Sequence, residues 1–146
     1  MRGLIQRVTH ASVTVDDKVV GRIDNGLLLF LGVQKGDTVA QADKLLQKVT
    51  RYRIFADEQD KMNNSLVDIS GGLLIVSQFT LAADTHKGLR PGFSSAAEPV
   101  VAKERYQYFV EQAQLIDDIE VATGVFAADM QIALVNDGPV TFLLET

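Results

Sequence analysis

The chain has no cysteine, and this absence excludes several kinds of chemistry. Disulfide bonds, thiolate nucleophiles and thiolate metal sites all require that residue. Histidine is nearly absent as well, since His10 and His86 are the only two. Neither belongs to a His-x-His pair or a His-Glu-x-x-His helix, and no Ser-His-Asp set is evident. We therefore expect no metal site, and we interpret both histidines as surface residues.

Glycine-rich loops that bind phosphates are also missing. The chain has neither the Gly-x-x-x-x-Gly-Lys loop of nucleoside triphosphatases nor the Gly-x-Gly-x-x-Gly turn of dinucleotide-binding enzymes. Nucleoside triphosphate and dinucleotide chemistry therefore lack support. We expect a protein that works without a cofactor.

Long hydrophobic runs are lacking too. The longest uninterrupted apolar stretch, Leu27 to Leu31, is far shorter than the roughly 18 residues that cross a bilayer, and the first residues lack the apolar core of a signal peptide. We therefore expect a soluble cytoplasmic protein with no membrane partner. The chain has 146 residues, of which 47% are hydrophobic, and this suffices for one ordinary core. We predict a single domain over residues 1–146.

The net charge of −5 argues against a surface coated with basic residues for long stretches of nucleic acid. Basic residues do gather locally, at Arg2, Arg7 and the segment 86–90, and a small patch is enough to hold the end of an RNA. Taken as charges alone, they are more typical of a solvated surface. Net charge does not decide whether RNA binds.

Alternating apolar and polar residues predict strands towards both ends of the chain. Residues 11–15 and 18–23 are expected to form a hairpin around Asp16-Asp17, and 27–33 is apolar on both faces, as in a central buried strand. Further strands are predicted at 52–55, 73–81, 119–121, 130–135 and 140–144.

Two helices are predicted between these strands. Thr38 and Gln41 have the spacing of a capping box before a helix that ends near Arg51. Pro99 suits the first turn of a second helix, whose apolar stripe is Ala102, Tyr106, Phe109, Val110 and Ala113. The segments 56–65 and 82–95 are expected to be loops. The pattern predicts an α+β fold of mixed, mainly antiparallel β-sheets, curled into a barrel-like core with two principal helices.

Ser77 and Thr80 stand at the far end of the predicted strand 73–81. Hydroxyls in strands more often satisfy local hydrogen bonds than perform chemistry. Neither residue has a base beside it in sequence, and a threonine hydroxyl without such a partner is a poor nucleophile. Any hydrolysis here must therefore depend on a reactive substrate, or on a group that the substrate brings.

Gly138-Pro139 lies between the predicted strands 130–135 and 140–144, where it has the composition of a hairpin corner. X-Pro bonds are cis in only about one in twenty cases in folded proteins, so sequence physics alone favours a trans bond. Glycine has no Cβ, which lets its backbone polar groups approach a ligand closely.

Several short segments, taken in order, form a pattern that is more specific than any one of them. They are Gln6-Arg7-Val8, 11–15, 26–28, 52–55, Ser77-Gln78-Phe79-Thr80-Leu81, 88–91 and 128–130, leading into Asn136 to Thr141. With these segments the chain resembles the D-aminoacyl-tRNA deacylases of bacteria and eukaryotes over essentially its whole length. One departure is Gly92, where many members have serine, and it affects only the expected geometry of that loop.

This resemblance implies hydrolysis of the ester that joins a D-amino acid to the terminal ribose of tRNA. Such an ester is already activated, and the neighbouring ribose hydroxyl can assist attack or orient water, so the protein need supply mainly positioning and an oxyanion site. By resemblance, backbone amides near Phe79 and Thr80 stabilise the oxyanion, while Ser77 and Gln78 shape the strand end. We assign Thr80 to substrate contact and orientation, with covalent attack as the alternative.

The resemblance also implies a homodimer in which a cis Gly138-Pro139 bond reaches into the active site of the partner subunit. There it would form a rigid main-chain wall that an L side chain strikes and a D side chain avoids. Glycine has no side chain, so glycyl-tRNA is expected as a second substrate. Arg7 would steady this loop, and Asn136 and Met130 would complete the substrate site at the 3′ end of the aminoacyl-tRNA.

Two other functions stay open on the residues alone. A non-catalytic domain for RNA or small ligands would bind tRNA ends without turnover. A general hydrolase of small esters or peptides would act on substrates that lack ribose. The second fits less well, because an unassisted serine or threonine cannot readily drive such chemistry.

Overall fold

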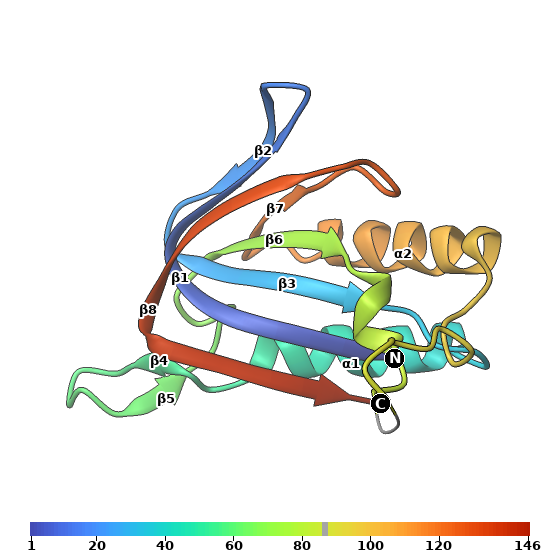
Figure 1. Ribbon diagram of the computed structural model, residues 1–146. Coiled ribbons are helices and arrows are strands. Elements are labelled where there is room, and N and C mark those ends of the chain that lie inside the picture. Colours follow the sequence, from blue (N-terminus) through green and yellow to red (C-terminus); the bar gives the residue numbers. More distant parts are fainter. Residues whose placement is uncertain (86–87) are drawn as a thin grey trace.

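A curled six-stranded sheet forms the centre of the computed structural model, which describes residues 1–85 and 88–146 (Figure 1). The strands run in the order β2-β1-β3-β6-β7. Strands β2 and β3 pair with different halves of one edge of β1, and β8 pairs with the opposite edge. The β3–β6 and β6–β7 pairs are parallel and the remaining pairs are antiparallel. The strands are β1 Arg2–Val15, β2 Lys18–Ile23, β3 Gly26–Gly32, β6 Gly72–Ser77, β7 Glu120–Thr123 and β8 Gln131–Glu145. This confirms the predicted mixed, mainly antiparallel sheet.

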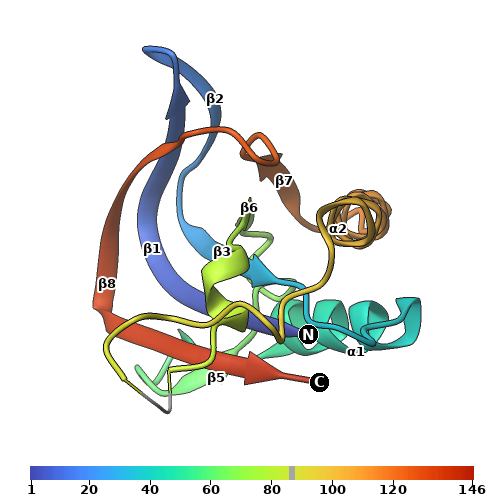
Figure 2. The same ribbon diagram turned by 45° about the vertical axis from the view of Figure 1, so that its right-hand side comes forward.

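The sheet curls because β1 is long enough to pair with two different strands along one edge. Its first half pairs with β3 and its second half with β2, while β8 follows the opposite edge for nearly its whole length. In Figure 2, β8 arches over towards β7. Gly21 of β2 has no side chain, and a Cβ there would lie only 2.3 Å from the carbonyl oxygen of Thr123 in β7. The edge strands β2 and β7 thus approach each other closely, but within the described ranges no ladder joins them, so the barrel is nearly but not fully closed.

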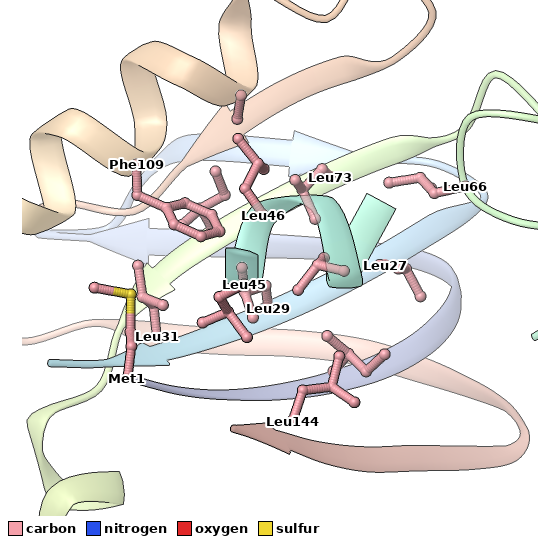
Figure 3. Close-up of a cluster of buried hydrophobic side chains, with 14 of the residues drawn as sticks. Met1, Leu27, Leu29, Leu31, Leu45, Leu46, Leu66, Leu73, Phe109 and Leu144 are labelled. Carbon is pink, nitrogen blue, oxygen red and sulfur yellow. The ribbon is translucent and has the colours of Figure 1, made fainter. Parts of the chain in front are cut away.

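Both faces of the central strands are buried, which explains their unbroken apolar sequences. Leu27, Leu29 and Leu31 of β3 point into a large cluster that also receives side chains from the helices (Figure 3). Leu28, between them, points into a second cluster with Val8, Val13, Ile23, Leu74 and Val76. The first cluster lies between the sheet and the helices, and the second lies inside the curl.

Two α-helices cover the outer face of the sheet. Helix α1, Val39–Arg51, begins after Thr38, whose backbone N–H donates to Oε1 of Gln41 at 3.0 Å, as the predicted capping box requires. Helix α2, Pro99–Gln114, begins with the proline expected in its first turn. Both predictions are confirmed. Among the described residues, no helix is long and apolar enough to cross a membrane.

Three predictions about strands differ from the structure, and the first two concern where a strand begins or ends. The strand expected at 73–81 ends at Ser77, because the chain turns into a 3-10 helix, η1 Phe79–Ala82, in which the Leu81 N–H donates to the Gln78 carbonyl oxygen at 3.2 Å. The strand expected at 52–55 is only β4, Phe55–Ala56, and it pairs with β5, Met62–Asn64, inside the segment predicted to be a loop.

The third difference concerns the predicted hairpin at Gly138-Pro139. Residues 131–136 and 141–145 both pair with β1 in the same antiparallel sense, so they form one bent strand, β8, rather than two strands of a hairpin. The Gly138-Pro139 bond is cis, whereas sequence physics alone favoured trans. The pairing of the segments on either side with β1 overrides the local turn signal of Asn, Asp, Gly and Pro.

The phenol of Tyr106 gives the stability of this fold a testable pH dependence. Tyr106 is 6% exposed and donates to the carbonyl oxygen of Ile75 at 3.0 Å, and burial raises the pKa of Tyr106 to about 12 from a usual value of 10.0. The folded protein therefore keeps this proton between those two values, where the unfolded chain has lost it. The contribution of this raised pKa to the free energy of unfolding is fully present below pH 10 and is lost as the pH rises towards 12.

We predict that Tyr106→Phe removes this alkaline decline and, below pH 10, lowers the free energy of unfolding by about 1 kcal/mol through the lost hydrogen bond. Urea unfolding at a series of pH values measures both effects. Equal slopes of unfolding free energy against pH in the two proteins would contradict the prediction.

Candidate active site

A pocket of about 510 Å³ opens where β6 ends. Its walls are mainly apolar, and its polar rim comes from Ser77, Gln78 and Phe79 at the strand end. Met130 lines the same pocket, so the structure brings four of the predicted site residues together. The apolar walls include Leu31, Val76, Tyr106, Phe126 and Ile132. A concave apolar site with a few polar groups at one end is typical of a small-ligand site.

At the end of β6, two backbone donors have no partner among the described residues. Gln78 still continues the sheet, since its N–H donates to the carbonyl oxygen of Leu31 at 2.8 Å. The chain then turns into η1, and the N–H groups of Phe79 and Thr80 donate to no other residue in the part of the chain that the structure describes. Unpaired amides at a pocket can stabilise an oxyanion.

The Thr80 hydroxyl also lies at this strand end, and its partner is an amide. Nε2 of Gln78 donates to Oγ1 of Thr80 at 2.6 Å. Whichever way this amide is turned, it has no group that takes up a proton at neutral pH. Gln78 can therefore orient the Thr80 hydroxyl but cannot activate it as a nucleophile.

The other predicted site residues form a bulge in the middle of β8. In the β1–β8 ladder, Gln6 pairs with Thr141 and Val8 pairs with Asn136, so Arg7 alone faces the four residues 137–140. Asp137, Gly138 and Pro139 are exposed, whereas the Val140 side chain is 6% exposed and packs in the core. The extra residues therefore project outward from a buried anchor.

Arg7 holds this bulge from the β1 side. Its Nε lies 3.1 Å from both the carbonyl oxygen and Oδ2 of Asp137, and its Nη1 donates to the carbonyl oxygen of Ile54 at 2.5 Å. The Arg7 side chain is only 13% exposed, so these charge-assisted bonds are partly shielded from water. Gly138 has φ of 135°, a region that favours glycine, and a Cβ there would lie 3.3 Å from Nη2 of Arg7.

Asn136 and Thr141 close the base of the bulge. Oδ1 of Asn136 accepts a bond from the Val140 N–H at 2.9 Å, and its Nδ2 donates to Oγ1 of Thr141 at 2.8 Å. Gln6 donates to the same Thr141 oxygen at 3.2 Å. These side chains tie the two ends of the bulge to each other and to β1, which makes its shape well defined.

The bulge and the pocket lie apart within one chain. Arg7 is in register with Leu27, and Leu27 with Leu73 at the beginning of β6, whereas Ser77 is at its other end. With about 3.3 Å per residue along a strand and about 4.8 Å between strands, the separation is on the order of 20 Å. Figure 1 shows the bend of β8 and the end of β6 at opposite ends of the sheet. One copy of the chain does not bring its two predicted groups of site residues together.

Some residues of both groups were not predicted as site residues. Tyr106 appeared only as part of the apolar stripe of the second helix, and the stripe did not show that one end of it lines a pocket. Phe126 precedes Met130 by four residues, but the segment had no periodic pattern that would have singled it out. Gln6 and Thr141 belong to segments that carry the family resemblance, but the sequence indicated no role for either residue.

The two histidines lie outside these groups. His10 is exposed on β1, where its Nδ1 lies 3.1 Å from the Thr9 hydroxyl, and His86 lies outside the described residues. Within the described ranges, no cluster of three or more His, Asp or Glu side chains is placed to hold a metal ion.

Comparison with known proteins gives one family for the whole chain. Residues 4–145 match the family model described as D-Tyr-tRNA(Tyr) deacylase. D-aminoacyl-tRNA deacylases of Cellvibrio japonicus and Stutzerimonas stutzeri are 63% and 60% identical to the chain, with at least 99% of each protein covered. A solved structure of the c-Myc DNA unwinding element binding protein superposes with a TM-score of 0.93 at 37% identity, covering 100% of this chain and 99% of that one. The chain belongs to the D-aminoacyl-tRNA deacylase family.

Proposed function

We propose that this protein frees tRNA from D-amino acids in the cytoplasm, and that it selects D esters by excluding L esters with the backbone at Gly138-Pro139. The observation that carries the proposal is that the amides of Phe79 and Thr80, beside an apolar pocket, have no partner in the described part of the chain. An oxyanion site of this kind suits an ester that is already reactive. Residues 1–146 act as one domain in this proposal.

The terminal nucleoside of the tRNA occupies the pocket, and the ester lies at the polar rim. The two amides donate to the oxygen that becomes negative as water attacks the carbonyl carbon. Ser77, Gln78 and Thr80 position the ester, and the neighbouring ribose hydroxyl orients the attacking water. The reaction breaks the acyl–oxygen bond and returns the proton to the ribose oxygen, giving free tRNA and the D-amino acid. No protein side chain needs to be a strong base in this scheme.

A second copy of the chain completes the site. The bulge of β8 lies on the order of 20 Å from the pocket of its own chain. Among the described residues β8 pairs with β1 alone, and its Val135 and Leu143 side chains are exposed. An edge strand with exposed apolar residues is suited to contact with another chain. In a two-fold homodimer, Gly138-Pro139 of each copy would reach the pocket of the other, giving two equivalent sites.

The Gly138-Pro139 main chain then acts as a wall beside the α-carbon of the substrate. An L side chain would point into this wall, and a D side chain would point away from it. Arg7, Asn136 and the buried Val140 side chain hold the wall in place. Exclusion by a wall makes no contact with the D side chain itself, so different D-amino acids are accepted, and glycyl-tRNA is also hydrolysed.

The direct test is to compare the hydrolysis of D-tyrosyl-tRNA, L-tyrosyl-tRNA and glycyl-tRNA by the wild-type protein. We expect rapid release of D-tyrosine and glycine, and release of L-tyrosine near the rate without enzyme. Equal rates for the two tyrosyl esters would contradict the wall. A lack of turnover with tight binding of tRNA would favour a non-catalytic RNA-binding domain.

We predict that Arg7→Ala narrows the ratio of D to L rates by about 10- to 100-fold, because small misplacements of a positioning group have effects of that size. The variant loses the bonds to Asp137 and Ile54 that hold the bulge. Arg22→Ala is the matched control, since the Arg22 side chain is 74% exposed and its carboxylate partner is 4.0 Å away. An unchanged ratio in Arg7→Ala, with the fold intact, would show that the bulge does not set chirality.

We predict that Thr80→Val lowers kcat for D-tyrosyl-tRNA by only about five- to tenfold, since one neutral hydrogen bond contributes about 1 kcal/mol. Loss of a covalent nucleophile would instead lower kcat by about a millionfold. Single-turnover rates measure the difference, and Thr9→Val, an exposed threonine of β1, is the control. Complete loss of activity with normal tRNA binding would support covalent attack by Thr80.

A further inference from the structure

Two exposed aromatic rings lie together at the rim of the pocket. Phe79 is 61% exposed and Phe93 is 41% exposed, although both are large apolar side chains. Their ring centroids are 5.1 Å apart and the ring planes are tilted by 50°. Phe79 also lines the pocket, so the pair continues the pocket wall outward onto the surface.

The backbone around Phe93 is held in place by bonds to its surroundings. Asp84 and Gly92 exchange two backbone hydrogen bonds, of 2.7 and 3.1 Å. The Lys35 N–H donates to the carbonyl oxygen of Ser95 at 2.9 Å, and the Ser95 hydroxyl donates to the carbonyl oxygen of Ala82. The segment that carries Phe93 is therefore attached both before and after the ring. The two rings form a preformed surface that loses little entropy on binding.

Two cations belong to segments next to Phe93. Arg90 is three residues before Phe93, and Lys35 is bonded through its backbone to the segment after it. Both residues are exposed, and neither forms an ion pair with any residue that the structure describes. Positive charges without carboxylate partners are available to phosphate groups.

We propose that Phe79 and Phe93 form a stacking platform for the nucleotide that precedes the terminal adenosine of the tRNA. The inference rests on the proposed function, which places the ester at the end of β6 and the terminal nucleoside in the pocket. The pocket volume of about 510 Å³ is within the range of about 300–1,000 Å³ that holds one ligand of ordinary size. The next nucleotide must therefore lie outside it, over the rim.

The chemistry of the rim fits a single-stranded nucleotide. The 3′ end of tRNA is unpaired, so its bases are free to stack on aromatic side chains. Lys35 and Arg90 would lie near the connecting phosphates. Stacking tolerates any base because every base has a π face. The platform therefore binds the common end of all tRNAs and leaves the choice of D over L to the bulge of β8.

The test compares two substrates that differ only in length, D-tyrosyl-adenosine and the D-tyrosyl ester of the trinucleotide cytidylyl-cytidylyl-adenosine. We expect the wild-type kcat/KM to be about tenfold or more higher for the trinucleotide, as one stacked base supplies an effect of that size. Phe93→Leu keeps an apolar side chain but removes the ring, and it should bring the ratio close to one. Phe93→Tyr keeps the ring and should preserve the ratio.

Phe142→Leu is the matched control, because Phe142 is 37% exposed and packs edge-on against Tyr52 at 5.2 Å, but does not line the pocket. The control should keep the wild-type ratio. A second readout is salt dependence. Lys35→Gln or Arg90→Gln should each reduce the slope of log KM against log salt for the trinucleotide by about 0.7, the value for one phosphate contact on a single strand.

Three results would overturn the platform. One is a wild-type ratio close to one. Another is an equal loss on both substrates in Phe93→Leu, which would mean that the ring only supports the oxyanion site. The third is a change in sedimentation coefficient in Phe93→Leu, which would mean that a second copy of the chain covers the rings. Failure of the wild type to hydrolyse either ester would overturn the proposed function, and the platform with it.

Discussion

The pairing of β1 with β8 is the constraint on which the rest of the molecule depends. It runs for most of both strands and is interrupted where Arg7 faces the four residues 137–140. The paired strand segments on either side hold both ends of this bulge, and the buried Val140 side chain attaches it to the core. The residues between them can only project outward. A fixed main-chain feature on the surface thus follows from the register of two strands.

The buried sheet is consistent with the proposed mechanism, in which backbone groups rather than reactive side chains act on the ester. The central strands pack on both faces, so their side chains are apolar and their polar groups pair with neighbouring strands. Where the strand pairing stops, backbone donors can lack a partner, as those of Phe79 and Thr80 after β6 do within residues 1–85 and 88–146. An activated ester needs little more than such donors and correct positioning. In the proposed mechanism the substrate supplies the reactivity, and the protein supplies rigid positioning.

Much of the fold could be predicted from the sequence because local signals and packing agree in most elements. The capping box at Thr38, the proline at the start of α2 and the buried strand 27–33 are examples. The signals failed where tertiary contacts decided. Gly138-Pro139 has the composition of a hairpin corner, yet pairing on both sides makes it a bulge within one strand. Likewise, no residue pattern showed that η1 would end β6 at Ser77.

The site was predictable only in part, for a related reason. The strand end and the bulge each consist of residues close together in sequence, so each could be proposed as part of a site from the sequence and its resemblance. Their relation in space depends on the sheet, which separates them by an amount on the order of 20 Å. The lining of the pocket by Tyr106 and Phe126 depends on contacts between distant segments. Such contacts leave no local pattern in a single sequence.

The most direct measurement is a crystal structure with a non-hydrolysable amide analogue of D-tyrosyl-adenosine. The account predicts the acyl oxygen at about 3 Å from the N–H groups of Phe79 and Thr80. It also predicts that Gly138 and Pro139 of a second copy lie against the α-carbon. An amino acid held by side chains of one copy alone, with both of these residues turned away from it, would contradict the account.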